Sequence, residues 1–305
     1  MPYPRCRTAP ERGQDEVSEP APETTTTPLR WAGEAAPPPT SPLVCLREAG
    51  GQRRLFVLRA GREVRCGRRK PVRGDTRPNH LVLRLLPCDA QRHPENWRAT
   101  LAISSQHLQF VLAHDGLRLI DLGRNGTLLD GRPMQPRFPA RLRAQFQIML
   151  GGVLRLRGRI EAPDGSGPIA IDPDAPLPLT GPLAPDAALA GAPEACLLER
   201  VANTARDSYL LLYRRATIGK SGERSWRVSA PGVAARHAAL LQHRGALLLA
   251  ALAPEGRTVV NGRALAPGTF TALVPGMELE FGESRWVLEA ARPADLAHLP
   301  DEPRT

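Results

Sequence analysis

The stretch "DLGRNGTLLDG", from Asp121 to Gly131, is short, polar and punctuated by glycines. A second stretch, "LAPEGRTVVNG", lies 131 residues later, from Leu252 to Gly262, and has lost most of the polar residues. His107 and His237 precede the two stretches and keep nearly the same offset, 130. Offsets that agree within one residue predict an internal repeat.

The two halves of the chain also share a pattern of short apolar or alternating runs between Gly, Pro, Asp and Asn. Examples are "LQFVLAH" and "LRLIDL" in the first half, and "MELEFG" and "RWVLEA" in the second. Many short strands with turn signals between them are typical of a β-sandwich or barrel, so we expect an all-β fold. The run "ALLLAAL" at 246–252 resembles a helix, but its length and flanking turns favour a strand.

The length of 305 residues predicts about two domains. Residues 1–42 have many prolines and threonines and no periodicity, which predicts a disordered tail. Residues 161–193 contain many prolines and acidic residues and predict an extended linker. We therefore expect one sandwich domain at 43–160, a second at 194–292, and a short tail at 293–305.

The two repeats differ in length near their beginnings. Gly67 in "CGRRK" and Gly219 in "IGKSG" correspond at an offset of 152, larger than the later offset. The first repeat therefore carries about 21 additional residues before its histidine. We expect this insertion to be a loop near residues 87–101, "PCDAQRHPENWRATL".

The net charge of +10 is concentrated in one segment. Residues 43–160 contain 23 basic and 8 acidic residues, so an anionic partner should meet this segment. Nucleic acid is the lesser expectation, because no recognition helix, aromatic stacking set or basic tail accompanies the charge.

Several classes of protein are disfavoured by what the sequence lacks. It has no apolar run of about 18 residues and no secretory h-region, which argues against a membrane protein and a secreted one. The five cysteines are scattered without a CxxC pair, which fits a reducing cytoplasm rather than a disulfide framework or zinc site. No GxSxG, HExxH or GxxxxGK[ST] motif is present, so we expect neither an enzyme nor a cofactor.

Three polar motifs occur in order in the first repeat: Gly67-Arg68, then "ISSQHLQF" from Ile103 to Phe110, then "DLGRNGT" from Asp121 to Thr127. This order and spacing resemble the forkhead-associated (FHA) domain, a β-sandwich that binds phosphothreonine peptides through loops at one end. The resemblance covers about residues 43–160 and, more weakly, 194–292.

The resemblance implies a phosphopeptide site whose residues can be named. Arg68 matches the arginine that pairs with phosphate, because a dianion suits an arginine fork. Ser104 matches the serine whose hydroxyl donates to phosphate, and Asn125 matches the asparagine that bonds the peptide backbone. Thr127 and His107 match positions that mostly brace the loops.

Four further residues complete the predicted set for the first repeat. Gly67 begins the first turn, and we expect Gly126 to have a positive φ. The family usually has Arg or Lys where this chain has Ser105, which removes a cation. The stretch before Asn-Gly-Thr is also one residue short and lacks a serine, so Arg124 or Arg69 is the candidate to restore positive charge.

The second repeat keeps scaffold residues such as His237 but loses the predicted ligands. Lys220 replaces the arginine, Ala234 and Ala235 occupy the serine and arginine positions, and Gly256 occupies the asparagine position. The sequence therefore predicts an adaptor whose first repeat binds a phosphothreonine protein in bacterial Ser/Thr-kinase signalling, either a kinase or its substrate. The alternatives are a scaffold that binds unphosphorylated partners and, less favoured, nucleic-acid binding by the basic first repeat.

Overall fold

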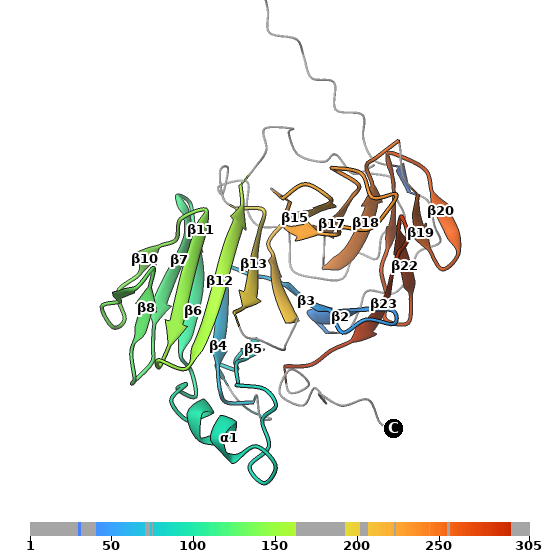
Figure 1. Cartoon of the computed structure of the whole chain (residues 1–305). Helices are drawn as coiled ribbons and strands as arrows, with labels where there is room; N and C mark the ends of the chain where they lie inside the picture. The colour runs from blue at the N-terminus through green and yellow to red at the C-terminus, as the bar shows by residue number, and fades with distance from the viewer. Residues whose placement is uncertain are drawn as a thin grey trace, which may run out of the picture.

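The computed structural model describes residues 30–31, 41–70, 74, 76–162, 193–201, 207–222, 224–243, 245–254 and 257–293. Three sheets and one short helix make up this part of the chain (Figure 1). The expected all-β class is confirmed, and the run at 246–251 is a strand as expected. Residues 163–192 of the linker expected at 161–193 lie outside the described residues, as do 294–305 and most of 1–42.

One sheet of twelve strands runs through the whole molecule in the order β20-β19-β22-β23-β2-β3-β14-β13-β12-β11-β8-β9. Its strands, in chain order, are β2 Leu43–Glu48, β3 Arg54–Arg59, β8 Thr127–Leu129, β9 Arg132–Pro133, β11 Gln145–Leu150, β12 Leu154–Glu161, β13 Ala195–Arg200, β14 Asp207–Leu212, β19 Thr258–Val260, β20 Arg263–Leu265, β22 Glu278–Phe281 and β23 Ser284–Ala290.

Two smaller sheets cover this central sheet. The five-stranded one, in the order β10-β7-β6-β4-β5, belongs to the first repeat, and the six-stranded one, in the order β1-β21-β18-β17-β15-β16, belongs mainly to the second. Their strands are β4 Glu63–Gly67, β5 Leu81–Val82, β6 Leu108–Ala113, β7 Gly116–Asp121, β10 Ala140–Arg141, and β1 Arg30–Trp31, β15 Arg215–Gly219, β16 Trp226–Arg227, β17 Ala238–His243, β18 Ala246–Ala251 and β21 Thr269–Ala272.

The middle of the central sheet is buried on both faces. In β2, Leu43 and Cys45 belong to the core under the five-stranded sheet, whereas Val44 and Leu46 belong to the core under the six-stranded sheet. The same alternation occurs in β13. Strands covered on both faces need continuous apolar runs, which explains stretches such as "LVCL" at 43–46.

The strand pairing exchanges one hairpin between the two repeats. We call β2–β3 the first hairpin and β13–β14 the second hairpin. β12, the last strand of the first repeat, pairs with β13 of the second hairpin. β23, the last strand of the second repeat, pairs with β2 of the first hairpin, and Figure 1 shows both adjacencies.

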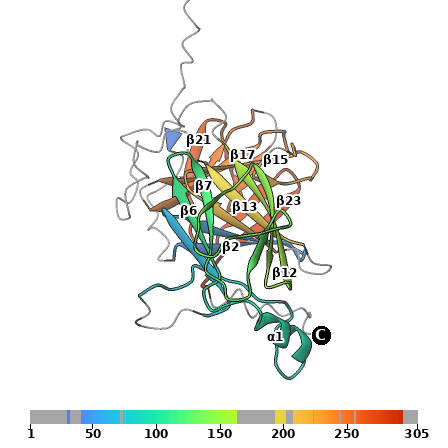
Figure 2. The same cartoon turned by 90° about the vertical axis from the view of Figure 1, so that its left-hand side faces the viewer.

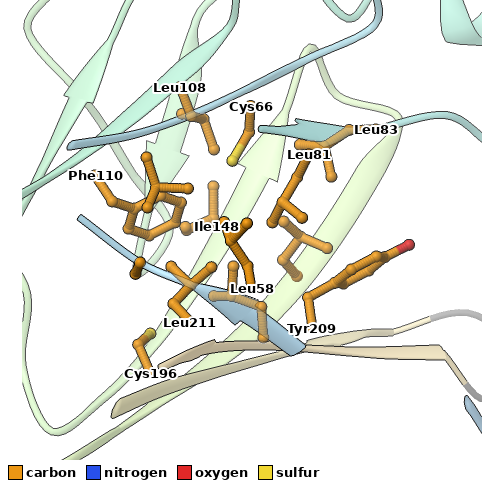
Figure 3. Close-up of a cluster of buried hydrophobic side chains, with 14 of the residues drawn as sticks. Leu58, Cys66, Leu81, Leu83, Leu108, Phe110, Ile148, Cys196, Tyr209 and Leu211 are labelled. Atoms are coloured by element: carbon orange, nitrogen blue, oxygen red, sulfur yellow. The ribbon is translucent and has the colours of Figure 1, made fainter. Parts of the chain in front are cut away.

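Two sandwiches result, and each contains strands from both repeats. Sandwich one consists of the five-stranded sheet packed on β8, β9, β11, β12 and the second hairpin. Figure 3 shows Cys196, Tyr209 and Leu211 of that hairpin in the same core as Cys66. Sandwich two consists of the six-stranded sheet packed on β19, β20, β22, β23 and the first hairpin. Strands from residues 43–160 therefore pair with strands from residues 194–292. The limits at 160 and 194 remain our proposal for where the two sequence repeats end and begin.

The two hairpins also join each other. β3 and β14 run parallel over six residue pairs, from Arg54↔Asp207 to Arg59↔Leu212. Arg54 forms a salt bridge with Asp207 at 3.0 Å, and the Asp207 side chain is fully buried. This contact makes the central sheet continuous from one sandwich to the other.

The charges at the strand pairs favour the exchanged arrangement. Arg157 of β12 lies opposite Glu199 of β13, and Arg47 of β2 pairs with Glu289 of β23 at 2.7 Å. The repeat offset of 152 makes Arg47 the counterpart of Glu199. The offset of 130 makes Val287 the counterpart of Arg157. Without exchange, Arg47 would therefore lie opposite Arg157, and like charges in that position destabilise a sheet.

The insertion of the first repeat differs from the loop expected at 87–101. Residues Pro94–Thr100 form helix α1, which has a proline in its first turn where a missing N–H costs nothing. Figures 1 and 2 place α1 at one end of sandwich one. The sequence pattern missed this helix because seven residues are too few to show an apolar periodicity.

Candidate functional site

The strand register gathers the three predicted motifs at one end of sandwich one. Cys66 pairs with Leu108 across β4 and β6, and Leu108 pairs with Asp121 across β6 and β7. The segments that continue from these residues, 67–70, 102–107 and 122–126, therefore lie next to one another. α1 leads directly into the second of them, so the insertion contributes to the same end.

Gly67 allows two of these segments to touch. A Cβ at this position would collide with the carbonyl oxygen of Ser105. The close approach lets the N–H of Arg68 donate to the carbonyl of Ser104 at 3.0 Å and the N–H of Arg69 donate to the carbonyl of Ser105 at 3.1 Å. Glycine is thus required here by contact between two backbones.

His107 braces the segment 102–107 from inside. Its side chain is fully buried, and Nδ1 accepts a hydrogen bond from the N–H of Ser104 at 2.9 Å. Its N–H donates to the carbonyl of Cys66, and its carbonyl accepts from Leu122, so one residue ties all three segments together. Burial removes water from the ring and thereby lowers the pKa of His107 below its ordinary value.

Arg68 has part of its guanidinium fixed and part unused. Nε donates to the carbonyl of Ile103 at 2.9 Å, which holds the side chain against the segment that carries Ser104. Within the described residues, the two terminal nitrogens have no hydrogen bond or ion pair. They can serve as a fork for an oxyanion.

The side chain of Ser104 links the second segment to the third. Its Oγ accepts a hydrogen bond from the N–H of Arg124 at 2.8 Å, so the hydroxyl proton can be donated elsewhere. Ser105 and the Arg124 side chain are both exposed at this end. Ser105, which stands at the position of the family's cation, and Arg124, a candidate to restore the charge, are therefore both accessible to a ligand.

Asn125 and its neighbours form the turn of the third segment. Nδ2 of Asn125 donates to the carbonyl of Ala102 at 2.8 Å, which leaves its side-chain oxygen able to accept from a ligand. Gly126 has a φ of 73°, the positive value expected. Thr127 is 2 % exposed, so its side chain stays inside the sandwich, as a bracing role requires.

Two residues of this end were not found from the sequence. Asn79 is buried, and its Nδ2 donates both to the carbonyl of Arg69 at 2.8 Å and to that of Ser105 at 2.7 Å. Arg84 donates from Nε to the carbonyl of Arg68 at 3.3 Å. In the register of β5 and β16 their counterparts in the second repeat are Arg224 and Ser229, which are different residue types, so the repeat signal did not mark them.

The exchanged hairpin also reaches this end. Arg200 of β13 donates from Nη2 to the carbonyl of Arg84, which in turn holds the carbonyl of Arg68. A residue of the second repeat therefore supports the backbone at the predicted phosphate ligand. Strand pairing across the repeats, which the sequence alone did not reveal, is what places Arg200 there.

The second repeat reproduces the frame of this end without its ligands. His237 is fully buried, and Nδ1 accepts from the N–H of Ala234 at 3.2 Å. The N–H of Lys220 donates to the carbonyl of Ala234 at 2.9 Å, and a Cβ on Gly219 would collide with the carbonyl of Ala235. Lys220 thus stands where Arg68 does, while Gly256 lies outside the described residues.

Two further observations bear on the kind of site. Among the described residues, no cluster of three or more His, Cys, Asp and Glu side chains is arranged to hold a metal ion. No helix in the described part of the chain has the length and apolar character needed to span a membrane.

Comparison with known proteins supports the repeat and the family. A family model described as "FHA domain" matches residues 64–151 and 216–282, about half of the chain in total. No curated protein sequence matches the chain significantly. FHA domains are interaction modules rather than enzymes.

Solved FHA structures resemble parts of the chain. The FHA domain of FhaA, solved with the intracellular domain of Rv3910, is 24 % identical, with a TM-score of 0.25, over 27 % of this chain and 87 % of that one. The N-terminal FHA domain of Rad53p from S. cerevisiae, solved with a phosphothreonine peptide, is 18 % identical, with a TM-score of 0.24, over 26 % and 69 %. EmbR from Mycobacterium tuberculosis, solved with a low-affinity phosphopeptide, is 14 % identical, with a TM-score of 0.25, over 32 % and 25 %.

Proposed function

The chain belongs to the FHA domain family, with two copies of the domain, and on that premise we propose that it is an adaptor whose sandwich one binds phosphothreonine in a partner protein. The proposal rests on the position of the Arg68 guanidinium, which is partly anchored and partly available to a ligand. One nitrogen is anchored at 2.9 Å to the carbonyl of Ile103, and the terminal pair is unused among the described residues. A fork held in this way loses little conformational entropy when it binds a dianion.

The surrounding groups complement a phosphorylated peptide. The hydroxyl of Ser104 can donate to a phosphate oxygen, and the side chain of Arg124 adds positive charge at the same end. The side-chain oxygen of Asn125 can accept an N–H of the peptide backbone. These groups project from loops between strands, where a rigid frame presents them to a partner.

Sandwich two takes a structural or protein-interaction role in this proposal. Its end retains the buried His237 brace but has alanines at the serine and arginine positions. Lys220 is a single point charge without a fork, so a phosphate dianion would lose hydration there for little return.

We further propose that the partner is a phosphorylated protein of a bacterial Ser/Thr-kinase pathway, either a kinase or its substrate, and that both meet in the cytoplasm. The four described cysteines, Cys45, Cys66, Cys88 and Cys196, are free thiols, as in a reducing compartment.

The test is a calorimetric titration of the intact chain with paired peptides that differ only in phosphorylation of one threonine, together with duplex DNA at several salt concentrations. Selective binding of the phosphopeptide supports the proposal. Equal binding of both peptides would favour the phospho-independent scaffold. Steeply salt-dependent DNA binding without peptide selectivity would favour the nucleic-acid alternative.

A further inference from the structure

A basic pocket lies at the junction of the two sandwiches. It has a volume of about 410 Å³, which is within the range of small-ligand sites. We call it the junction pocket, and its lining residues are Arg53, Arg54, Leu55, Arg159, Leu197, Glu199, Ser208, Trp226, Arg227, Ser229 and Trp286. These residues come from both hairpins, from β12, from β23 and from the segment around β16, so the pocket depends on the hairpin exchange.

The junction pocket is separate from the predicted phosphothreonine site. Arg159 lies five residues beyond Leu154, the end of β12 nearest the site, which corresponds to about 17 Å along a strand. It also lies on the other face of the central sheet, because its pairing partner Leu197 belongs to the core of sandwich two.

Two of the four arginines in the pocket have carboxylate partners. Arg54 is neutralised by Asp207 at 3.0 Å. Arg53 lies 3.9 Å from Glu48, and its guanidinium is 5.6 Å from the centre of the Trp286 ring. The charge of Arg53 is therefore only loosely balanced.

The other two arginines have no carboxylate partner among the described residues. Arg159 uses both terminal nitrogens on carbonyl oxygens, those of Gly222 and Ser225, and its Nε is buried without a partner. Arg227 is exposed, and its side chain makes no ion pair with the described residues. Glu199 is the acidic member of the lining, so its carboxylate offsets one of the positive charges there.

From this charge arrangement we infer that the junction pocket binds a phosphate-type oxyanion, carried by a phosphate monoester or a pyrophosphate group. Among the described residues, Arg159 and Arg227 bring to the cavity two positive charges without a carboxylate partner, against the single carboxylate of Glu199. Guanidinium groups match phosphate oxygens in geometry and charge. The hydroxyls of Ser208 and Ser229 supply further donors at the wall. The ligand would contact β12 of sandwich one and the β16 segment of sandwich two, and so strengthen the junction.

The test uses the intact chain with Arg68→Ala, so that the phosphothreonine site does not contribute. Pyrophosphate is titrated calorimetrically at constant ionic strength into this protein and into versions that add Arg227→Gln or Arg155→Gln. Arg155 is the matched control, because it is an exposed arginine on the same strand as Arg159 but outside the pocket. Arg227 is exposed, so its replacement should leave folding intact.

We expect saturable binding of pyrophosphate that Arg155→Gln leaves unchanged and Arg227→Gln weakens at least ten-fold. The melting temperature should rise with pyrophosphate in the control and not in Arg227→Gln. Inorganic phosphate and phosphoserine, titrated in parallel, distinguish a pyrophosphate source from a monoester source. Equal affinity in the two variants, or citrate binding as tightly as pyrophosphate, would overturn the inference.

Discussion

Phe56 of β3 and Tyr209 of β14 are paired in register on parallel strands, and their rings stack with centroids 5.6 Å apart and planes at 18°. The first residue belongs to the first repeat and the second to the second repeat, yet both lie in the core of sandwich one. The two FHA copies therefore share a core at their junction rather than being joined only by a linker.

The first prediction concerns the hairpin exchange. Leu46 and Leu198 are counterparts in the two repeats, and both are fully or almost fully buried. Leu198→Ala should reduce hydrogen-exchange protection in β11 of sandwich one, and Leu46→Ala should reduce it in β22 of sandwich two, because each leucine packs in the sandwich of the other repeat. Each change should cost about 2–5 kcal/mol. If Leu198→Ala instead reduced protection in β22 and Leu46→Ala reduced it in β11, each repeat would keep its own hairpin.

The second prediction concerns the ion pair between the hairpins. Arg54→Ala should lower the free energy of unfolding by about 3–5 kcal/mol, because it removes the guanidinium that lies 3.0 Å from the buried Asp207 carboxylate. Arg47→Ala removes an exposed pair with Glu289 and should cost less than about 1 kcal/mol. Denaturant unfolding of both variants measures the difference, and equal losses would argue against the tight β3–β14 contact.

The third prediction concerns the phosphate ligands. Arg68→Ala and Ser104→Ala should each reduce phosphothreonine-peptide affinity about ten-fold or more, the scale of about 1.5–3 kcal/mol for charge-assisted hydrogen bonds. Arg143→Ala is the control, since it removes one exposed arginine before β11 begins, at the other end of the same sandwich. Calorimetry on folded variants measures the change. Unchanged affinity in the first two variants would place the site elsewhere.

The fourth prediction concerns pH. Burial lowers the pKa of His107 and of His237 below the ordinary value of about 6.5. Below about pH 6.5 the unfolded chain therefore binds protons that the folded chain does not. The contribution of the two neutral, buried histidines to the free energy of unfolding is fully present above about pH 6.5 and is lost as the pH falls toward the folded pKa. The free energy of unfolding should therefore decrease below pH 6.5, and His107→Gln should make the decrease shallower. His114→Gln, at an exposed position, is the control, and an equal effect from it would refute the burial argument.

The sequence predicted the strands, the repeat and the three motifs, because each depends on local pattern: turn glycines, apolar alternation and fixed spacing. Gly67 and Gly219 are conspicuous for this reason, since both prevent a backbone collision in the same place. The family resemblance supplied the roles of Arg68 and Ser104, and the structure shows the anchored guanidinium and the hydroxyl that these roles need.

The hairpin exchange was not predictable from those patterns. Either hairpin has the apolar runs to complete either sandwich, so periodicity cannot choose between them. The choice depends on which charges meet across strands, such as Arg157 with Glu199, and such pairs can be compared only when the register is known. Arg200 and the junction pocket follow from the exchange and were missed with it.

A titration of equivalent positions of the two copies in the intact chain decides which sandwich binds the phosphate. A phosphothreonine peptide is titrated into the wild-type protein, Arg68→Ala and Lys220→Ala. We expect Arg68→Ala to weaken binding at least ten-fold and Lys220→Ala to leave it unchanged. Loss of binding in Lys220→Ala with full binding in Arg68→Ala would contradict this expectation, because the phosphate would then be bound by sandwich two.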